Sequence, residues 1–562
     1  MPYPIKYIEN NLVWNNEGEC FAYYELIPFN YSFLSLEQKD AVHDAFRQLI
    51  AQNRDGKIHA LQISTESSIC AAQERSKKSV TGRLKEIACA EIDEQTENLV
   101  ASLGDTQVDY RFFLGFKLVV TDKELSMKDV GKQVKNVLFD AANAISSSFM
   151  GDFVSMPNDE IRRYSRMEKL MENKLSRRFK VRRLDKNDFG YLLEHIYGRT
   201  GTAYEDFAFT LPLKKRKRDT LVKKYDLIKP ARCLIEEKQR YLHMKSEDSE
   251  SYVAYFTISD VVGELDFPSS EIFYYQEQQF DFAIDTSMNV EIITNKAALH
   301  TVRNKKKELK DLDNHAWENN SETTNQVAEA LDSVDELESV LDQSKESMYK
   351  LSYVVRVTAP DTEELKRRCN QVRDFYDDAS IKLVRPIGDM MGLHNEFIPA
   401  SKRYMNDYVQ YVTSDFLAGL GFGATQMLGE RDGIYLGYNV DTDQNVYVQP
   451  ARAAQGVKGS VTNALSGAFL GSLGGGKSLS FNLLTYYAVL NGAQALILDP
   501  KSERGLWKEK LPEIADEINI VNLTSDEENK GMLDPYIIMR KTKDAESLAL
   551  DVLTFLTGIS SR

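Results

Sequence analysis

The stretch GSLGGGKS at residues 471–478 decides the fold of the C-terminal part of this 562-residue chain. It fits the P-loop pattern G-x-x-x-x-G-K-[ST] without a mismatch. Glycines, which have no Cβ atom, let successive backbone N–H groups face the oxygens of a bound phosphate. The stretch therefore predicts a nucleoside triphosphate site with the binding residues Gly471, Gly474, Gly475, Gly476, Lys477, Ser478 and Leu479.

Two side chains of this stretch have specific expected roles. The Lys477 ammonium should reach the β and γ phosphates, and it is the candidate for stabilising charge in the transition state. The Ser478 hydroxyl is the expected Mg²⁺ ligand. A helix predicted at 479–490 would point its positive end at the same anion. The predicted cofactors are ATP and Mg²⁺, and the other catalytic residues are unknown.

The elements around the motif support this interpretation. An apolar strand is predicted at 468–470, the helix at 479–490 ends at Gly492, and a second strand is predicted at 495–499. Strand, P-loop, helix and strand follow one another in the order that the motif requires. A degenerate glycine turn is the alternative, and this order argues against it.

Asp499 ends the apolar run ALILD and allows two interpretations. It could be a Walker-B ligand of Mg²⁺, or it could end the neighbouring strand and line the nucleotide crevice without holding the metal. About twenty residues separate it from the P-loop, which favours the second interpretation. Asp499 is therefore counted among the nucleotide-binding residues.

Few strands follow the motif. Beyond 495–499 a further strand is predicted only at 518–521, whereas a P-loop domain needs a wider parallel sheet covered on both faces. No later apolar strand ends in Asp-Glu to supply a Walker-B carboxylate and a catalytic base. We expect an incomplete P-loop α/β domain of the RecA-like type over 426–562. It should bind nucleotide without turning it over alone.

The region before it reads as α+β in two subdomains. The first covers 1–160, a basic helical and loop segment covers 161–250, and the second subdomain covers 251–425 with a long helical hairpin at 297–344. A linker is expected at 401–429, and no internal repeat is evident. Strands are predicted at 20–26, 58–63, 111–120, 251–262, 271–275, 281–284, 350–359, 381–384, 434–439 and 446–450, and helices at 35–51, 128–150 and 362–377.

Charge is unevenly distributed along the chain. The net charge is −15, which disfavours a surface that coats nucleic acid. Residues 161–218, with KKRKR at 214–218, hold 17 Lys/Arg against 7 Asp/Glu, a local charge of +10. Such a segment points to a partner of its own, although exposed charge is usually only solvated. Five scattered cysteines indicate a reducing compartment, and no apolar run predicts a signal peptide or a membrane span.

These motifs resemble those of the conjugative-transfer ATPases of type IV secretion systems, the family of the fourth VirB protein and its TraC/TraE-type relatives. The likeness is greatest to versions from Gram-positive plasmids and integrative elements. It rests on the P-loop, the strand pair GIYLGYNVDTDQNVYVQP at 433–450, ALILDPKSERG at 495–505 and MLDP at 532–535. Asp499, Pro500, Lys501 and Glu503 match the family's second box, with Ser502 where glycine is usual. Asp534 stands where the family prefers Asn and inherits no role.

The resemblance implies a cytoplasmic motor at the base of a transfer channel, peripheral on the inner face of the cell membrane. Its implied partners are membrane-embedded channel subunits, other motor ATPases, a coupling protein and copies of itself in a hexamer. Contact of the basic segment with anionic lipid is a further expectation. The family's Walker-B carboxylates, glutamine motif and arginine finger would lie beyond Arg562.

Three functions are compatible with the sequence. The first is an ATP-binding motor component that energises conjugative DNA or protein transfer through a type IV secretion channel. The second is a nucleotide-regulated structural scaffold of that channel. The third is a ring translocase acting directly on duplex DNA, which the acidic balance of the chain disfavours.

Overall fold

The structure is a computed structural model of the chain. It forms two compact units, one made of Met1–Ser79 and Ile92–Ser480 and the other of Val80–Glu91 and Phe481–Arg562. The residues that it describes are 3–53, 56–119, 158–198, 207, 222–223, 233–246, 249–261, 267–280, 282–318, 325–451, 454, 466–522 and 530–559. The helix predicted at 128–150 and the basic loop at 214–218 lie outside these residues.

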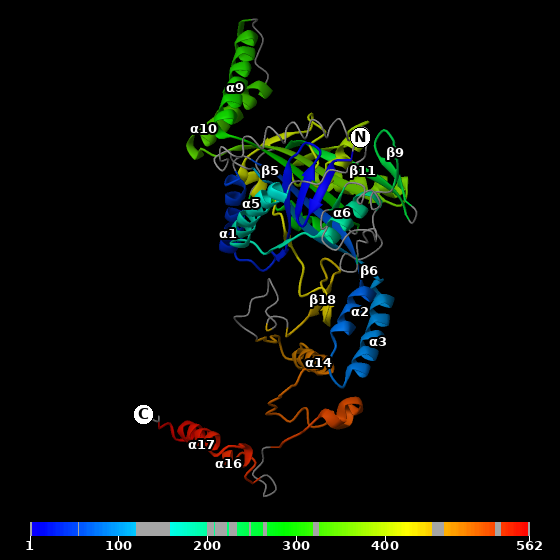
Figure 1. The fold of residues 1–562 in the computed structure, drawn as a ribbon, viewed down its shortest axis with the longest axis vertical. Helices are drawn as coiled ribbons and strands as arrows, with labels where there is room; N and C mark the ends of the chain where they lie inside the picture. Colours follow the sequence, from blue (N-terminus) through cyan, green and yellow to red (C-terminus); the bar gives the residue numbers. More distant parts are fainter. Residues whose placement is uncertain are drawn as a thin grey trace. The chain divides into compact units, whose positions relative to one another are not determined.

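The first unit is a mixed α/β structure built on one 14-stranded sheet in which every strand pair is antiparallel (Figure 1). The main path runs β8-β1-β2-β3-β6-β5-β12-β13-β11-β10-β9, and β7, β14 and β15 pair with β3, β11 and β13. The strands are β1 (Ile5–Glu9), β2 (Leu12–Asn15), β3 (Cys20–Leu26), β5 (Lys57–Ser68), β6 (Thr106–Lys117), β7 (Val181–Arg183), β8 (Val222–Lys223), β9 (Leu234–Glu237), β10 (Leu242–Lys245), β11 (Glu250–Val261), β12 (Ile284–Ile293), β13 (Met348–Ala359), β14 (Ile381–Val384) and β15 (Gln410–Val412).

The sheet contains an internal duplication. Strands β3, β5, β6 and β7 lie in the order β7-β3-β6-β5, and β11, β12, β13 and β14 lie in the order β14-β11-β13-β12. Both sets follow the chain order 4-1-3-2 of a ferredoxin-like βαββαβ unit. No repeat is evident along the sequence, so this duplication was not predicted. Strand order and pairing carry the repeat, and neither is visible as similarity between residues along the sequence.

The two halves join through their equivalent second strands. β5 pairs with β12, with Lys57 opposite Glu291, so that the sheet continues from one half into the other. Each half also carries two helices inserted between its second and third strands. These are α2 (Ile69–Ser79) and α3 (Lys85–Leu103) in the first half, and α9 (Asn295–Glu318) and α10 (Asn325–Ser344) in the second. The predicted helical hairpin is thus confirmed, with Arg303 and Lys306 of α9 bound to Glu338 of α10 at 2.8 Å each.

Helices cover both faces of the sheet because the strands alternate their apolar side chains between the faces. In β6, Phe112 and Leu114 belong to one core and Phe113 to the other. The first core packs under α1 (Leu36–Ala51), α5 (Asn158–Ser176), α8 (Ile272–Gln279), α11 (Thr362–Asp378) and α13 (Ser414–Gly419). The second core packs under α6 (Lys186–Gly198) and α12 (Met390–Asn395).

Local signals located several elements correctly. Helix α1 follows a capping box in which Ser35 Oγ accepts from Gln38 N at 3.3 Å, and α11 follows Asp361, whose carboxylate accepts from Glu364 N at 2.8 Å. The strand predicted at 20–26 is β3. The predicted linker at 401–429 instead contains α13 and β15 and buries Leu420 in the first core. It also holds β16 (Ala424–Thr425), which pairs in parallel with β4 (Phe29–Asn30).

Two other predictions need correction. Residues 271–275, predicted as a strand, belong to α8, because Ile272, Phe273 and Gln276 bury one helical face. The strand predicted at 281–284 begins only at Ile284. Both errors come from short apolar runs, which fit a strand or one turn of a buried helix equally well.

The second unit is helical in its described residues. It holds most of α14 (Lys477–Leu490), α15 (Trp507–Lys510), the 3-10 helix Pro512–Glu517, α16 (Pro535–Ile538) and α17 (Thr542–Thr557). The strands predicted at 468–470, 495–499 and 518–521 are not strands in the structure. No described strand pairs with them, and Leu470, Leu496 and Leu498 are 90%, 90% and 83% exposed. A strand needs a neighbour for its hydrogen bonds, and these segments have none among the described residues. No described helix is long and apolar enough to span a bilayer.

Candidate phosphate-binding site

The glycines of the 471–478 loop adopt conformations that other residues avoid. Gly474 and Gly476 have φ angles of +79° and +77°, in the left-handed region that glycine enters without steric cost. Between them, Gly475 N donates to Ser472 O at 3.2 Å and closes a tight turn. The loop backbone is therefore curved where the motif predicts a phosphate cradle.

Lys477 is the first residue of α14, and its side chain folds back over this turn. Its Nζ atom donates to Ser472 O at 2.5 Å. A Cβ atom on Gly471 would lie 3.3 Å from Lys477 Cγ, and one on Gly475 would lie 3.2 Å from Ser472 O. Larger side chains at these two glycines would thus press on the lysine stem or on the turn. Glycine at both positions thus leaves room for the lysine stem and the turn without displacing either.

Helix α14 gives the loop its anion-binding end. Its first turn closes with the hydrogen bond from Ser480 N to Gly476 O, at 2.9 Å. The amides that precede this bond have no acceptor within the helix, and they are the donors that bind phosphate at a helix start. Ser478 and Leu479 lie exposed in this turn. The loop thus fits a triphosphate, which Lys477 and the amides of Gly474 and residues 476–479 would hold while Ser478 would hold Mg²⁺.

Asp499 belongs to the second unit and has partners of its own there. Its carboxylate accepts from Arg504 N at 2.8 Å and Lys501 N at 3.3 Å, and it pairs with Arg504 Nη1 at 3.3 Å. The Arg504 amide, followed by the Lys501 amide and the Arg504 guanidinium, holds the pKa of Asp499 below its usual value although burial opposes this. Asp499 therefore caps the turn at 499–504 and does not end a strand, which corrects the interpretation from sequence.

Arg504 ties this turn to α14. Its Nε atom donates to Asn482 Oδ1 at 3.0 Å, and its guanidinium lies over the rings of Phe481 and Trp507. Ser502, at the position where the resembled family has glycine, adopts φ +53°. A left-handed residue at this point explains why glycine suits the turn.

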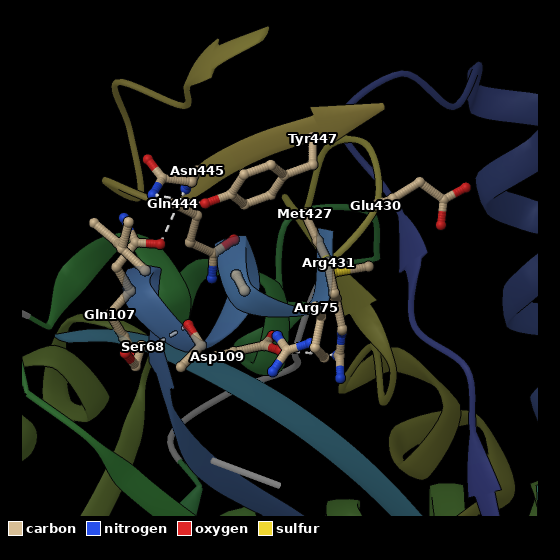
Figure 2. A pocket seen from close by; sticks show the side chains of 13 residues that line it. Ser68, Arg75, Gln107, Asp109, Met427, Glu430, Arg431, Gln444, Asn445 and Tyr447 are labelled. Carbon is tan, nitrogen blue, oxygen red and sulfur yellow. Dashed lines mark hydrogen bonds and ion pairs between the residues drawn. The ribbon is translucent and has the colours of Figure 1, made fainter. Parts of the chain in front are cut away.

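A pocket lies beside β17 (Ile434–Tyr438) and β18 (Asn445–Val448), the predicted strand pair before the P-loop. Figure 2 shows this pocket, which the strand pair forms with the side chains of Arg75 and Asp109. Arg431 Nη2 pairs with Asp109 Oδ2 at 2.8 Å, and Arg75 pairs with Asp432 at 3.6 Å. Two ion pairs thus attach the strand pair, one to α2 and the other to β6.

Hydrogen bonds to the main chain strengthen this attachment. Gln107 of β6 donates to Asp443 O at 2.7 Å and accepts from Asn445 N at 3.2 Å. Gln444 donates in return to Val108 O at 3.1 Å. Sequence reasoning found the strand pair but none of these side chains, because no local pattern links residue 107 with residue 444.

Comparison with known proteins places a family match on the C-terminal part of the chain. Residues 444–562 match the family described as AAA-like domain. The chain is also 20% identical to the uncharacterized protein YddE of Bacillus subtilis (strain 168), over 97% of this chain and 67% of that protein. The loop at 471–478 lies inside the matched region. The chain therefore carries an AAA-like domain, which indicates a P-loop ATPase.

Proposed function

We propose that this chain is the ATP-binding motor component of a type IV secretion channel, where it energises conjugative transfer of DNA or protein. One observation carries the proposal: a P-loop with left-handed glycines and a folded-back Lys477 lies inside an AAA-like domain. A large duplicated α/β region precedes this domain and is attached to the strand pair at the start of the matched residues. That arrangement suits a motor that must pass force to channel subunits.

Within the site, the residues have separable tasks. The loop amides would orient the triphosphate. The Lys477 ammonium would release Ser472 O and donate instead to oxygens of the β and γ phosphates. Bound Mg²⁺ would neutralise charge on the same oxygens, with Ser478 as its protein ligand. Asp499 is engaged by Arg504 and two turn amides, so it is poorly placed to accept a proton from water. The proposal is therefore that this chain alone binds ATP without turning it over.

The remaining parts of the proposal concern partners and location. The protein would act from the cytoplasmic side, peripheral to the membrane, beside channel subunits, a coupling protein and other motor ATPases. It would also assemble with copies of itself, as a hexamer. These expectations rest on the resemblance to conjugative-transfer ATPases.

Equilibrium binding of ATP with Mg²⁺, measured beside steady-state phosphate release, tests the nucleotide proposal. Lys477→Ala should weaken binding at least tenfold, because it removes a charge-assisted contact of about 1.5–3 kcal/mol. Lys508→Ala, an exposed lysine of α15 outside the loop, is the matched control and should leave binding unchanged. Turnover that depends on Lys477 would overturn the proposal of binding without turnover, and Asp499 or Glu503 would become catalytic candidates.

The structural scaffold is the second candidate function, and the continuous sheet through both halves favours it. A transfer assay with Lys477→Ala in the complete channel separates the two. Loss of transfer with normal channel assembly supports the motor. Full transfer supports the scaffold. Stimulation of turnover by duplex DNA, with salt-sensitive DNA binding, would support a duplex translocase instead.

A further inference from the structure

Helix α5 separates its charges between two sides. Two of its carboxylates, Glu168 and Glu172, face the protein, where Glu168 is buried and accepts from Tyr24 OH at 3.0 Å, Asn11 Nδ2 at 3.1 Å and Arg183 Nε at 2.8 Å. Glu172 also pairs with Arg183, at 2.8 Å. These carboxylates therefore cannot neutralise cations on the outer side of the same helix.

The outer side carries a basic stripe, defined here as Arg162, Arg166 and Lys169 of α5 and Arg177 in the turn that follows it. Arg162, Arg166 and Lys169 are four and three residues apart, which places them on one side of the helix. Arg177 follows Lys169 by eight residues and lies approximately on the same side. All four side chains are exposed, and none has a hydrogen bond or ion pair with a described residue. Leu170 lies beside Lys169 and is 64% exposed.

The duplication supplies an internal comparison. Helix α11 has the position in the second half that α5 has in the first, and it also carries several arginines. There Arg367 and Arg368 both pair with Glu364, at 2.7 and 2.6 Å, and Arg373 lies 3.4 Å from Asp374. The equivalent helix thus pairs its three arginines with carboxylates of its own. The basic stripe is a feature of α5 and not a consequence of the repeated fold.

We propose that the basic stripe is a docking surface for a lipid bilayer that contains anionic headgroups. Four cations that have no partner among the described residues, on a chain of net charge −15, form a local site for phosphate-bearing lipid. An exposed leucine among cations suits a helix that lies in the headgroup region with an apolar side chain inserted. The stripe holds no aromatic residue on which a nucleic-acid base could stack, which favours lipid over single-stranded nucleic acid.

This inference rests on the proposed function in one respect: it names the surface through which the protein would contact the membrane. Vesicle binding and ATP binding are measured separately, so either can fail alone. Lys477→Ala should bind vesicles as the unchanged protein does, because the P-loop is not part of the stripe.

The test is flotation of the full chain with vesicles of phosphatidylcholine, with and without phosphatidylglycerol. Binding is expected only to the anionic vesicles and should fall with rising salt. The triple variant R162Q/R166Q/K169Q should reduce partitioning on the order of a hundredfold, since each cation near an anionic surface contributes roughly fivefold. The matched control is K366Q/R367Q/R373Q in α11, which removes the same charge and should leave partitioning nearly unchanged.

Two outcomes would overturn the inference. Equal losses in the two triple variants would mean that total charge, and not the stripe, determines binding. Failure of the unchanged protein to float, together with stripe-dependent binding to a short DNA duplex, would assign the surface to nucleic acid. Circular dichroism and thermal unfolding of both variants should match the unchanged protein, so that a loss cannot come from misfolding.

Discussion

Arg431 and Asp109 form an ion pair of 2.8 Å that holds the segment before β17 against β6, although 322 positions separate them in the chain. Both side chains are largely buried, at 24% and 16% exposure, so the pair is less screened than a surface ion pair. Gln107 binds the main chain of β18 on the same side of the sheet. The strand pair, whose second strand β18 lies at the start of the AAA-like match, is thus held by the duplicated sheet.

Replacing Arg431 should loosen this attachment. Arg431→Ala is expected to speed amide hydrogen exchange in β17 and β18 about tenfold, because one partly buried ion pair contributes about 1–2 kcal/mol. The Glu430 amide precedes Arg431 and donates to Tyr447 O at 2.7 Å, so its exchange should be affected directly. In a double-mutant cycle with Asp109→Ala, the coupling free energy should be about 1 kcal/mol.

The control for this cycle is Lys382→Ala, whose partner Asp260 lies 3.6 Å away on an exposed surface. It should leave exchange in β17 and β18 unchanged. If Arg431→Ala also leaves their exchange unchanged, the hydrogen bonds of Gln107 and Gln444 hold the strand pair without help from the ion pair.

Ser478→Ala should remove the magnesium dependence of ATP binding. The hydroxyl is the expected protein ligand of Mg²⁺, so its loss should weaken binding about tenfold with Mg²⁺ present and little in a chelator. Isothermal titration under both conditions measures the difference. Ser472→Ala is the control, because only the carbonyl of Ser472 binds Lys477 and that carbonyl remains. An equal loss with and without the metal would contradict the assigned role.

Ser502→Gly should stabilise the turn at 499–504. Serine at φ +53° bears a left-handed cost of about 1–2 kcal/mol, which glycine avoids at a smaller entropic cost of about 0.5–1 kcal/mol. The gain of about 0.5–1 kcal/mol should appear as slower exchange of the Gly505 amide, which donates to residue 502 at 3.3 Å. Lys501→Gly, where φ is not positive, should have the opposite effect. Faster exchange in Ser502→Gly would show that the turn does not strain serine.

The features that sequence predicted well are those that neighbouring residues determine. The loop around Gly474 and Gly476 and the caps at Ser35 and Asp361 depend on contacts within a few positions. Predictions from short apolar runs were less reliable. The run at 271–275 was predicted as a strand, but it opens a helix whose apolar face packs against the sheet.

Distant pairings could not be predicted from these local patterns. The joining of β5 to β12 unites segments more than 200 positions apart, and both strands alternate in the same way as many others. The predicted strand at 495–499 had the right composition, but composition cannot supply the neighbouring strand that would hold it. The interpretation of Asp499 from sequence failed for the same reason: it assumed a sheet edge, whereas in the structure a turn determines the partners of this side chain.

Glu277, near the end of α8, should make the stability of the first unit decrease with rising pH. It is buried, and it accepts from Gln426 N at 2.8 Å. Burial raises its pKa to about 8. The Gln426 amide opposes this rise, and the charge of nearby Asp109 adds to it. Between the unfolded value of about 4.3 and this folded value, the native state binds more protons than the unfolded state, so unfolding becomes easier as pH rises. Below about pH 4 this contribution to the pH dependence disappears.

Glu277→Gln should abolish this dependence and stabilise the protein at pH 8 by on the order of 3 kcal/mol. The glutamine carbonyl can still accept from the Gln426 amide, and it carries no charge to desolvate. Urea unfolding at pH 5 and pH 8, followed by circular dichroism, measures the effect, with the exposed Glu363→Gln as the control. If Glu277→Gln were instead less stable than the unchanged protein at pH 8, the carboxylate would have to be ionised in the folded state, and the Gln426 amide would then outweigh its burial.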